Sequence, residues 1–287
     1  MDHENFEFPP TPEAMAEGLR TALPGAWRID WVERTGSTNA DLLAQARHNA
    51  GIPARPWLLG CHLQEQGRGR AGRTWQNRRG ANLMFSCAFD IFLPARQLPT
   101  LAPLIGTSSC ETLRGLLGQD TRKRLLMKWP NDLLWDQGKL VGILIETTRA
   151  GTATAPDHFI VIIGLGLNLR DARALSQSLS RQVSDWAGIA AADPLAGQID
   201  AVTLVARLAR AWYDDLNRVT ARGFKGLATR YAKVDALEGQ HLDVLDDGRL
   251  LYTGIACGID AEGRLLLRNA QGEIAVSVGE VSVRARP

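Results

Sequence analysis

The 287-residue sequence predicts an α+β fold, in which a mixed β-sheet with flanking helices is followed by a small all-β module. Apolar and polar side chains alternate over 83–89, as they do in a half-buried strand. Apolar residues keep a helical period over 201–216. From Asp235 onward, short strand-like segments are separated by turns at 246–248, 260–263 and 269–272, the spacing of a small antiparallel barrel.

The individual elements follow from the same periodicities and from their breakers. Thr38 and Asp41 resemble a capping box at the start of a helix that Gly51 and Pro53 end. Pro130 stops a strand because proline has no amide hydrogen to donate. After a loose chain end over 1–12, we expect a helix over 12–19, a strand over 27–32, the helix from 38, strands over 57–63 and 83–89, a helix over 101–117, a strand from 125, a hairpin of 133–135 and 139–146, a strand over 160–169, and helices over 201–216 and 224–231.

A loop of three glycines and three arginines, residues 67–73, directly follows the apolar strand 57–63. We call residues 67–73 the Gly-Arg loop. Glycines let backbone N–H groups approach a ligand closely. Arginines add planar, fixed charges that match carboxylate or phosphate groups. The loop therefore predicts a site for a phosphate-bearing anion.

Other interpretations of the glycine-rich segments are weaker. Gly67, Gly72 and Arg73 come within one residue of a P-loop, but lysine would stand at 73 and no helical period follows. An arginine-rich arm that binds nucleic acid would be expected in a disordered tail, whereas this segment lies between two apolar strands. The remaining alternative is a charged loop that is simply exposed to solvent. The glycines at 164 and 166 lack the third glycine of a dinucleotide fingerprint, since Leu169 occupies its place.

Composition restricts the class of protein. There are 33 basic and 31 acidic residues, a net charge of +2, which argues against a general nucleic-acid binder. The four cysteines at 61, 87, 110 and 257 form no C-x-x-C pair, so we expect free thiols, no disulfide and no zinc site. The polar N-terminus does not resemble a signal peptide, and the longest apolar run, 159–167, is too short to span a bilayer. We expect a cytoplasmic protein that binds neither nucleic acid nor membrane.

Five short motifs, in one order along the chain, closely resemble the biotin protein ligases, also called biotin–[acetyl-CoA carboxylase] ligases. The resemblance covers about residues 30 to 287 and implies a catalytic domain related to class II aminoacyl-tRNA synthetases, followed by an SH3-like barrel. It implies an N-terminal extension over 1–26, a catalytic biotin- and ATP-binding domain over 27–234 and the SH3-like domain over 235–287. The motifs are Ser37-Thr38-Asn39, Gln64 with Gly67-Arg68-Gly69-Arg70, Lys128-Trp129-Pro130-Asn131-Asp132, Lys139 to Leu144, and Gly166-Leu167-Asn168.

The resemblance implies a two-step reaction. Biotin and ATP, with Mg²⁺, give biotinyl-5′-AMP, and the biotinyl group then passes to a lysine of a biotin carboxyl carrier protein of acetyl-CoA carboxylase or a related carboxylase. Related enzymes occur as monomers or homodimers. Only about thirty residues precede the catalytic pattern, so we expect a monofunctional ligase without the N-terminal helix-turn-helix domain of some family members, and without operator binding.

The same resemblance assigns roles to residues. It places Ser37, Thr38 and Gln64 on the ureido ring of biotin and Lys139 near the biotin carboxylate. It places Asn168 with Lys128 on the nucleotide side, and makes Asp132 the candidate for Mg²⁺ binding or for ligand positioning. It implies that the Gly-Arg loop closes over the intermediate. The implied catalytic residues are Arg68, Arg70, Lys128 and Lys139. The implied biotin- and ATP-binding residues are Ser37, Thr38, Asn39, Gln64, Gly67, Arg68, Gly69, Arg70, Arg73, Trp75, Lys128, Asn131, Asp132, Lys139, Gly142, Gly166 and Asn168.

Two residues depart from the family pattern. Glu65 follows Gln64, and we expect it to point away from the anion site; Ala71 stands where some members have arginine.

Two other functions remain possible on the sequence alone. A lipoate ligase or octanoyltransferase would share the fold. A non-catalytic scaffold with an SH3-like interaction module would bind no nucleotide. The tryptophan at 129 and the Gly-Arg loop favour biotin.

Overall fold

A computed structural model describes residues 10–48, 56–150, 156–279 and 281–285. Its helices are α1 (Pro12–Ala22), α2 (Thr38–His48), α3 (Leu101–Arg114), α4 (Ala172–Leu179), α5 (Trp186–Ala192), α6 (Ala201–Arg222) and α7 (Leu227–Tyr231), with short 3-10 turns at η1 (Arg70–Gly72), η2 (Ala95–Thr100), η3 (Arg122–Arg124) and η4 (Ala196–Gln198). Its strands are β1 (Arg28–Thr35), β2 (Trp57–Gln64), β3 (Asn82–Phe92), β4 (Leu125–Lys128), β5 (Asp132–Trp135), β6 (Gly138–Arg149), β7 (His158–Asn168), β8 (His241–Asp246), β9 (Arg249–Ile259), β10 (Leu265–Asn269), β11 (Gly272–Val276) and β12 (Ser282–Ala285).

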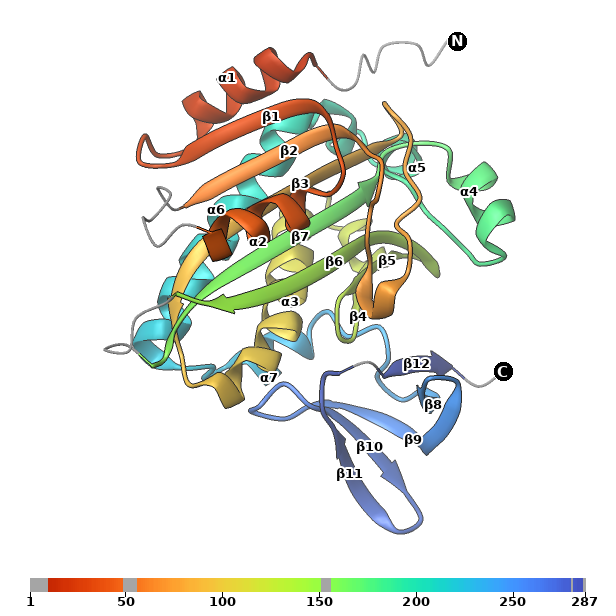
Figure 1. Ribbon diagram of the computed structural model, residues 1–287. Helices are drawn as coiled ribbons and strands as arrows, with labels where there is room; N and C mark the ends of the chain where they lie inside the picture. Colours follow the sequence, from red (N-terminus) through yellow and green to blue (C-terminus); the bar gives the residue numbers. More distant parts are fainter. Residues whose placement is uncertain (1–9, 49–55, 151–155, 280, 286–287) are drawn as a thin grey trace.

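The strands form two sheets (Figure 1). The larger has the order β1-β2-β3-β7-β6-β5-β4, with β1 parallel to β2 and the other neighbours antiparallel. The smaller has the order β11-β10-β9-β8-β12 and its pairs are antiparallel. The predicted mixed sheet with flanking helices, and the all-β module after it, are therefore confirmed.

The two faces of the large sheet carry different helices. Leu58 of β2 faces the main core, which α1, α3 and α6 cover, whereas its neighbours Trp57 and Leu59 pack with Leu42 and Leu43 of α2 on the other face. Successive side chains of a strand point to opposite faces of the sheet. The strand β2 therefore contributes to the main core on one face and to the smaller cluster with α2 on the other. The helix α2 thus lies across β3, β6 and β7, where its first residues enter the functional site.

The small sheet shares the main core with the large one and lies beside its β4 end (Figure 1). Its Leu242 and Val244 are fully buried in the main core. The indole Nε1 of Trp129 donates to the carbonyl of Gly263 at 3.0 Å, and the Thr100 hydroxyl donates to the carbonyl of Glu262 at 2.7 Å. The predicted domain boundaries at 26 and 234 stay predictions, although α1 also belongs to this core.

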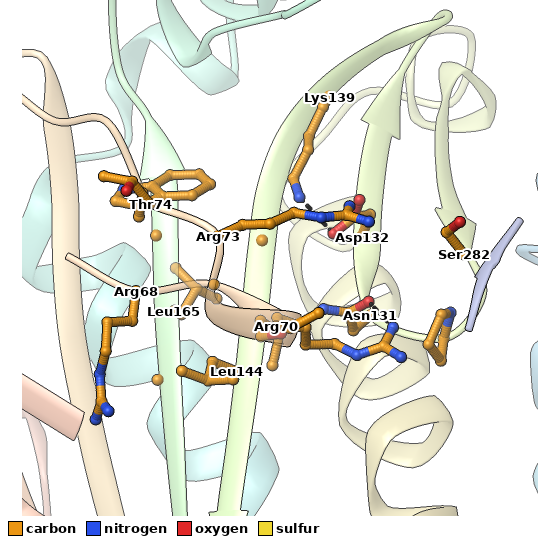
Figure 2. A pocket seen from close by; sticks show the side chains of 18 of the residues that line it. Arg68, Arg70, Arg73, Thr74, Asn131, Asp132, Lys139, Leu144, Leu165 and Ser282 are labelled. Atoms are coloured by element: carbon orange, nitrogen blue, oxygen red, sulfur yellow. Dashed lines mark hydrogen bonds and ion pairs between the residues drawn. The ribbon is translucent and has the colours of Figure 1, made fainter. Parts of the chain in front are cut away.

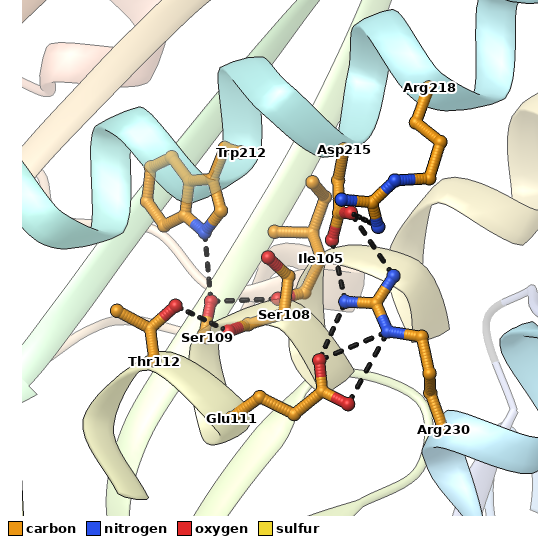
Figure 3. A network of polar contacts seen from close by, with 9 residues as sticks. All are labelled: Ile105, Ser108, Ser109, Glu111, Thr112, Trp212, Asp215, Arg218 and Arg230. Carbon is orange, nitrogen blue, oxygen red and sulfur yellow. Dashed lines mark hydrogen bonds and ion pairs between the residues drawn. The ribbon is translucent and has the colours of Figure 1, made fainter. Parts of the chain in front are cut away.

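Three helices are held together by a charged network beneath the sheet (Figure 3). Arg230 of α7 donates to Glu111 of α3 at 2.6 Å and to Asp215 of α6 at 2.7 Å. The indole of Trp212 donates to the Ser109 hydroxyl at 2.9 Å.

None of the helices in the described part of the chain is long and apolar enough to cross a membrane.

The predicted capping box is wrong in detail. Thr38 is the first residue of α2, and the amide of Ala40 is 3.4 Å from the hydroxyl of Ser37, which takes the capping position. The carboxylate of Asp41 instead accepts from the Thr35 hydroxyl. The predicted helix end at Gly51 and Pro53 lies outside the described residues, as does most of the predicted loose end over 1–12.

Candidate functional site

A cavity of about 830 Å³ lies beside the Gly-Arg loop, between the start of α2, the middle strands of the large sheet and β12 of the small sheet. All the predicted binding residues line it except Gly67 and Asn168. Glu65 does not line it, and its carboxylate pairs with Arg34 at 3.3 Å, as expected for a side chain that points away. The fold therefore brings together residues that are far apart in sequence.

The Gly-Arg loop is a short hairpin and not the start of a helix. The amide of Gly69 donates to the carbonyl of Arg73 at 2.7 Å, and the amide of Trp75 donates to the carbonyl of Gly67 at 2.8 Å. Ala71 and Gly72 turn the chain with φ of 51° and 67°. A P-loop would lead into an α-helix here, so the structure excludes that interpretation.

One end of the cavity is lined mainly by buried hydroxyl and amide groups. We call it the uncharged end, although the ion pair of Arg68 and Glu146 borders it. The Thr38 hydroxyl lies 2.7 Å from the Ser86 hydroxyl, which donates to Oδ1 of Asn39 at 2.6 Å. The backbone amide of Thr38 donates to Oε1 of Gln64 at 2.9 Å. Leu144 adds an apolar wall to this end. A ring that carries both polar and apolar edges fits such surroundings.

The opposite end is cationic. Arg73, Lys128 and Lys139 line it, and Lys139 Nζ lies 2.6 Å from Oδ1 of Asp132 (Figure 2). Burial lowers the pKa of Lys128, and the nearby Lys139 lowers it further, although Asp132 opposes both. An anion that enters this end would stabilise the charged form of the lysine.

The two arginines that the sequence grouped as catalytic lie apart. Arg70 reaches toward Asn131, to which it donates at 3.0 Å, and toward the small sheet (Figure 2). Arg68 extends in the opposite direction, where its Nη2 lies 3.5 Å from Glu146 at the uncharged end. In this conformation only Arg70 and Arg73 of the loop can act on a ligand's negative charge at the cationic end.

The indole of Trp75 is held between the loop and two glycines of the sheet. A Cβ added at Gly166 would lie 2.4 Å from the indole, so this position requires glycine for the ring to fit where it does. A Cβ at Gly142 would lie 3.0 Å from the indole, which is a tight contact. Lys139 Nζ lies 5.8 Å from the ring centroid. Among the described residues the buried Nε1 of Trp75 has no hydrogen-bond partner. Buried donors are normally paired, so this atom is a candidate contact for a ligand.

Asn168 is placed differently from its predicted role on the nucleotide side. Its amide donates to the carbonyls of Lys139 at 3.1 Å and Ser184 at 3.2 Å, and its oxygen accepts from Asn82 at 3.1 Å. The side chain is buried and borders only a smaller neighbouring cavity. In this arrangement Asn168 supports the backbone that carries Lys139, and its predicted ligand contact remains untested.

Asp132 is the predicted Mg²⁺ ligand. The described residues contain no group of three or more His, Cys, Asp or Glu side chains that could hold a metal ion. Nucleotide-bound Mg²⁺ commonly takes one or two carboxylates together with substrate phosphates. Asp132, at the cationic end, fits that second arrangement and not a preformed metal cage.

Several lining residues were not predicted from the sequence. Ser86 and Leu165 lie on strands whose alternation reads as ordinary core, and Arg181 follows a helix that buries no side chain. Arg284 comes from β12, which the sequence placed in a separate module. No local pattern could have revealed them, because only the fold brings them to the loop. With the predicted residues they complete a cavity that has hydroxyl and amide groups at one end and cationic side chains at the other.

Comparisons with known proteins agree with this geometry. The sequence profile of the biotin/lipoate A/B protein ligase family matches residues 31–168, and that of the biotin protein ligase C terminal domain matches residues 239–284. The second match agrees with an SH3-like small sheet. The chain is 31% identical over 269 residues to the biotin–[acetyl-CoA-carboxylase] ligase of Mycobacterium tuberculosis, covering 92% of this chain and 93% of that protein.

Two further comparisons extend over similar lengths. A protein of the same name from Paracoccus denitrificans is 31% identical over 254 residues, covering 86% of this chain and 97% of the other. The solved structure of biotin protein ligase from Aquifex aeolicus in complex with biotin and ATP has a TM-score of 0.70 at 22% identity, covering 90% of this chain and 99% of that one. At that identity the structural match shows a common fold.

Proposed function

Because the chain belongs to the biotin/lipoate A/B protein ligase family, and within it to the biotin ligases, we propose that it joins biotin to a protein lysine. It activates the biotin carboxylate with ATP as biotinyl-5′-AMP and releases pyrophosphate, and the lysine amine then attacks the carbonyl carbon to form the amide and release AMP. The observation that carries this proposal is the cavity with one uncharged and one cationic end. Biotin has the matching polarity, with a ureido ring at one end and a carboxylate at the other.

The ring of biotin occupies the uncharged end. Ser37, Thr38 and Gln64 supply hydrogen-bonding groups there, and Leu144 packs against the apolar part of the ring. The carboxylate then points toward Lys139 and Arg73. This orientation directs the reacting oxygen to the cationic end, where the phosphates of ATP are held by Lys128 and the arginines.

The first half-reaction brings two anions together. The carboxylate attacks the α-phosphate, and pyrophosphate leaves, so catalysis depends on neutralising charge and holding the groups in line. Arg70, Arg73, Lys128 and Lys139 surround the place where this happens. Closure of the Gly-Arg loop would keep water from the mixed anhydride.

The remaining components follow from this assignment. Asp132 would hold Mg²⁺ together with the nucleotide, and the ion would neutralise charge on the phosphates. The acceptor is a biotin carboxyl carrier protein. The three buried cysteines, Cys61, Cys87 and Cys110, are free thiols, which suits a reducing compartment such as the cytoplasm.

The test is ATP–pyrophosphate exchange by the purified protein with magnesium, run in parallel with biotin, lipoate, octanoate or no acid. We expect exchange only with biotin. Exchange with lipoate or octanoate instead would move the protein to the neighbouring activity of the same fold. No exchange with any acid would contradict a ligase and favour the scaffold interpretation.

A further inference from the structure

A carboxylate that the sequence did not single out, Glu146 of β6, lies at the end of the polar chain behind the uncharged end of the cavity. Building on the proposed activation of biotin, we propose that Glu146 is a positioning residue that fixes the direction of this hydrogen-bond chain. As a result the Thr38 hydroxyl is presented to the ligand as an acceptor for an N–H group. Asn39 and Ser86 form the hydrogen bonds that link Glu146 to the Thr38 hydroxyl.

The chain of contacts begins at the carboxylate. Nδ2 of Asn39 donates to Oε2 of Glu146 at 3.0 Å and to the carbonyl of Leu144 at 3.3 Å. A carboxylate can only accept, so the amide of Asn39 must face it with its NH₂ group. The other side of that amide, Oδ1, is therefore turned toward Ser86.

The direction set at Glu146 passes to the two hydroxyls. Ser86 donates its hydrogen to Oδ1 of Asn39 at 2.6 Å, so its oxygen remains free to accept. The Thr38 hydroxyl, 2.7 Å away, gives its single hydrogen to Ser86 in preference to Gln64 at 3.3 Å. The Thr38 oxygen then has lone pairs and no hydrogen left for the cavity, which selects an N–H donor such as a ureido group.

The geometry leaves Asn39 little freedom to turn away. Asn39 and Ser86 are 3% and 1% exposed. A Cβ added at Gly164 would lie 2.1 Å from Oδ1 of Asn39, so the glycine provides the space that the amide occupies. Glu146 itself is partly exposed and also faces Arg68 at 3.5 Å. That pair is long and solvated, so the hydrogen bond to Asn39 is the contact that matters.

The decisive variant is Glu146→Gln, which keeps the shape but adds a donor that can face Asn39. The amide of Asn39 then loses its charged acceptor, and only the neutral carbonyl of Leu144 at 3.3 Å still holds its NH₂ group in place. Turning the amide over, which would reverse the two hydroxyls, therefore becomes less costly. We expect the KM for biotin to rise about tenfold, since a hydrogen bond to a charged group is worth about that factor or more. The KM for ATP and the kcat of exchange should stay within about twofold, within the scatter of independent sites.

A polarity swap distinguishes this role from simple packing. In the double variant Asn39→Asp with Glu146→Gln, the glutamine donates to the aspartate, and the aspartate still accepts from Ser86. The aspartate loses only the long contact to the carbonyl of Leu144 at 3.3 Å, which accepts and cannot donate to it. The double variant should therefore recover part of the biotin affinity that Glu146→Gln loses, with a biotin KM within about threefold of wild type. The matched control is Glu65→Gln, which removes a nearby exposed carboxylate that pairs with Arg34 outside the cavity.

The outcomes separate this inference from the proposed function. A biotin KM that is raised in Glu146→Gln and falls back toward the wild-type value in the double variant supports it. An unchanged biotin KM in Glu146→Gln overturns the inference and leaves the function intact. If wild-type protein shows no biotin-dependent exchange, both are overturned. If Glu146→Gln fails to melt cooperatively, the double variant decides alone: near-normal biotin KM supports the chain, and a KM raised about tenfold or more contradicts it.

Discussion

The guanidinium of Arg70 donates to the main-chain carbonyl of Gly279, which ties the Gly-Arg loop to the segment between β11 and β12. A second nitrogen of the same group donates to Asn131 at 3.0 Å, and a further contact reaches the carbonyl of Val281 at 3.4 Å. One side chain thus joins the loop, the turn between β4 and β5, and the C-terminal module. The module is therefore part of the candidate active site as well as of the core.

Replacing Arg70 should slow adenylate formation. Arg70→Ala removes a cation from the site and also releases the loop from its two anchors. We expect the single-turnover rate of biotinyl-5′-AMP formation to fall by about 10²–10³, the usual effect of losing one preorganised electrostatic donor. The measurement is a rapid-quench assay with radiolabelled ATP at saturating biotin.

The control for Arg70 is Arg78→Ala. Arg78 follows the same loop but is exposed, and it pairs with Asp171 at 2.6 Å outside the cavity. Its removal should change the rate by less than about twofold, since exposed ion pairs contribute little. Equal rates for Arg70→Ala and wild type would remove Arg70 from the site.

The close packing of Trp75 on Gly166 predicts a steric effect. Gly166→Ala would place a methyl group 2.4 Å from the indole, so the ring must move and carry the loop with it. We expect kcat/KM for ATP to fall by about 10²-fold, because small displacements of positioning groups are that costly. Gly197→Ala is the control, since its added Cβ would meet no atom nearer than 3.9 Å. Normal kinetics in Gly166→Ala would show that the indole position is irrelevant.

The fold was largely predictable because its strands and long helices carry strong periodicity. Every strand predicted before Asp235 is present, but α4 and α5 were not predicted. The helix α4 buries none of its side chains, and α5 has only seven residues, so neither leaves a usable apolar pattern. The capping box failed because Thr38 is held by Gln64, a tertiary contact that no local rule contains.

The site was predictable where its residues form contiguous motifs and not where they meet only in space. Lys128 and Asp132 belong to one motif, whereas Ser86 and Arg284 come from elements with no chemical signal of their own. The sequence identified Arg68 and Arg70 as site residues but did not predict that they point to opposite ends of the cavity. Their directions depend on their partners, Glu146 for Arg68 and Asn131 for Arg70. Sequence patterns identify which segments meet, and side-chain direction needs the fold.

Burial of Lys128 predicts opposite effects of pH on activity and on stability. Burial is the main cause of its lowered pKa, so the folded protein loses this charge at a lower pH than a free lysine does. We expect kcat/KM for ATP to fall as pH rises through that lowered pKa. In the same window the unfolded chain still holds the proton, so the contribution of Lys128 to stability increases with pH.

The two pH effects can be separated with Lys128→Arg, since a guanidinium stays charged throughout. The alkaline fall in kcat/KM for ATP should move to higher pH in this variant, as measured by exchange assays over a pH series. Thermal melts over the same series should lose the part of the pH dependence that Lys128 supplies. An unchanged alkaline limb would mean that another group titrates.

The charged network around Arg230 predicts a loss of stability without a loss of chemistry. Asp215 is 4% exposed at its side chain and accepts from Arg230 at 2.7 Å, whereas the side chain of Arg230 is 25% exposed. Asp215→Asn removes one charge from this pair. Breaking a fully buried pair costs about 3–5 kcal/mol, and partial exposure of Arg230 reduces this to about 2 kcal/mol.

Asp214→Asn is the control, because Asp214 is exposed on the same helix and pairs with Arg210 at 3.2 Å. Urea denaturation should separate the two variants by about that amount, while both keep wild-type exchange rates at 25 °C. Equal stability of the two variants would mean that the network contributes no net stabilisation to the packing of α3, α6 and α7.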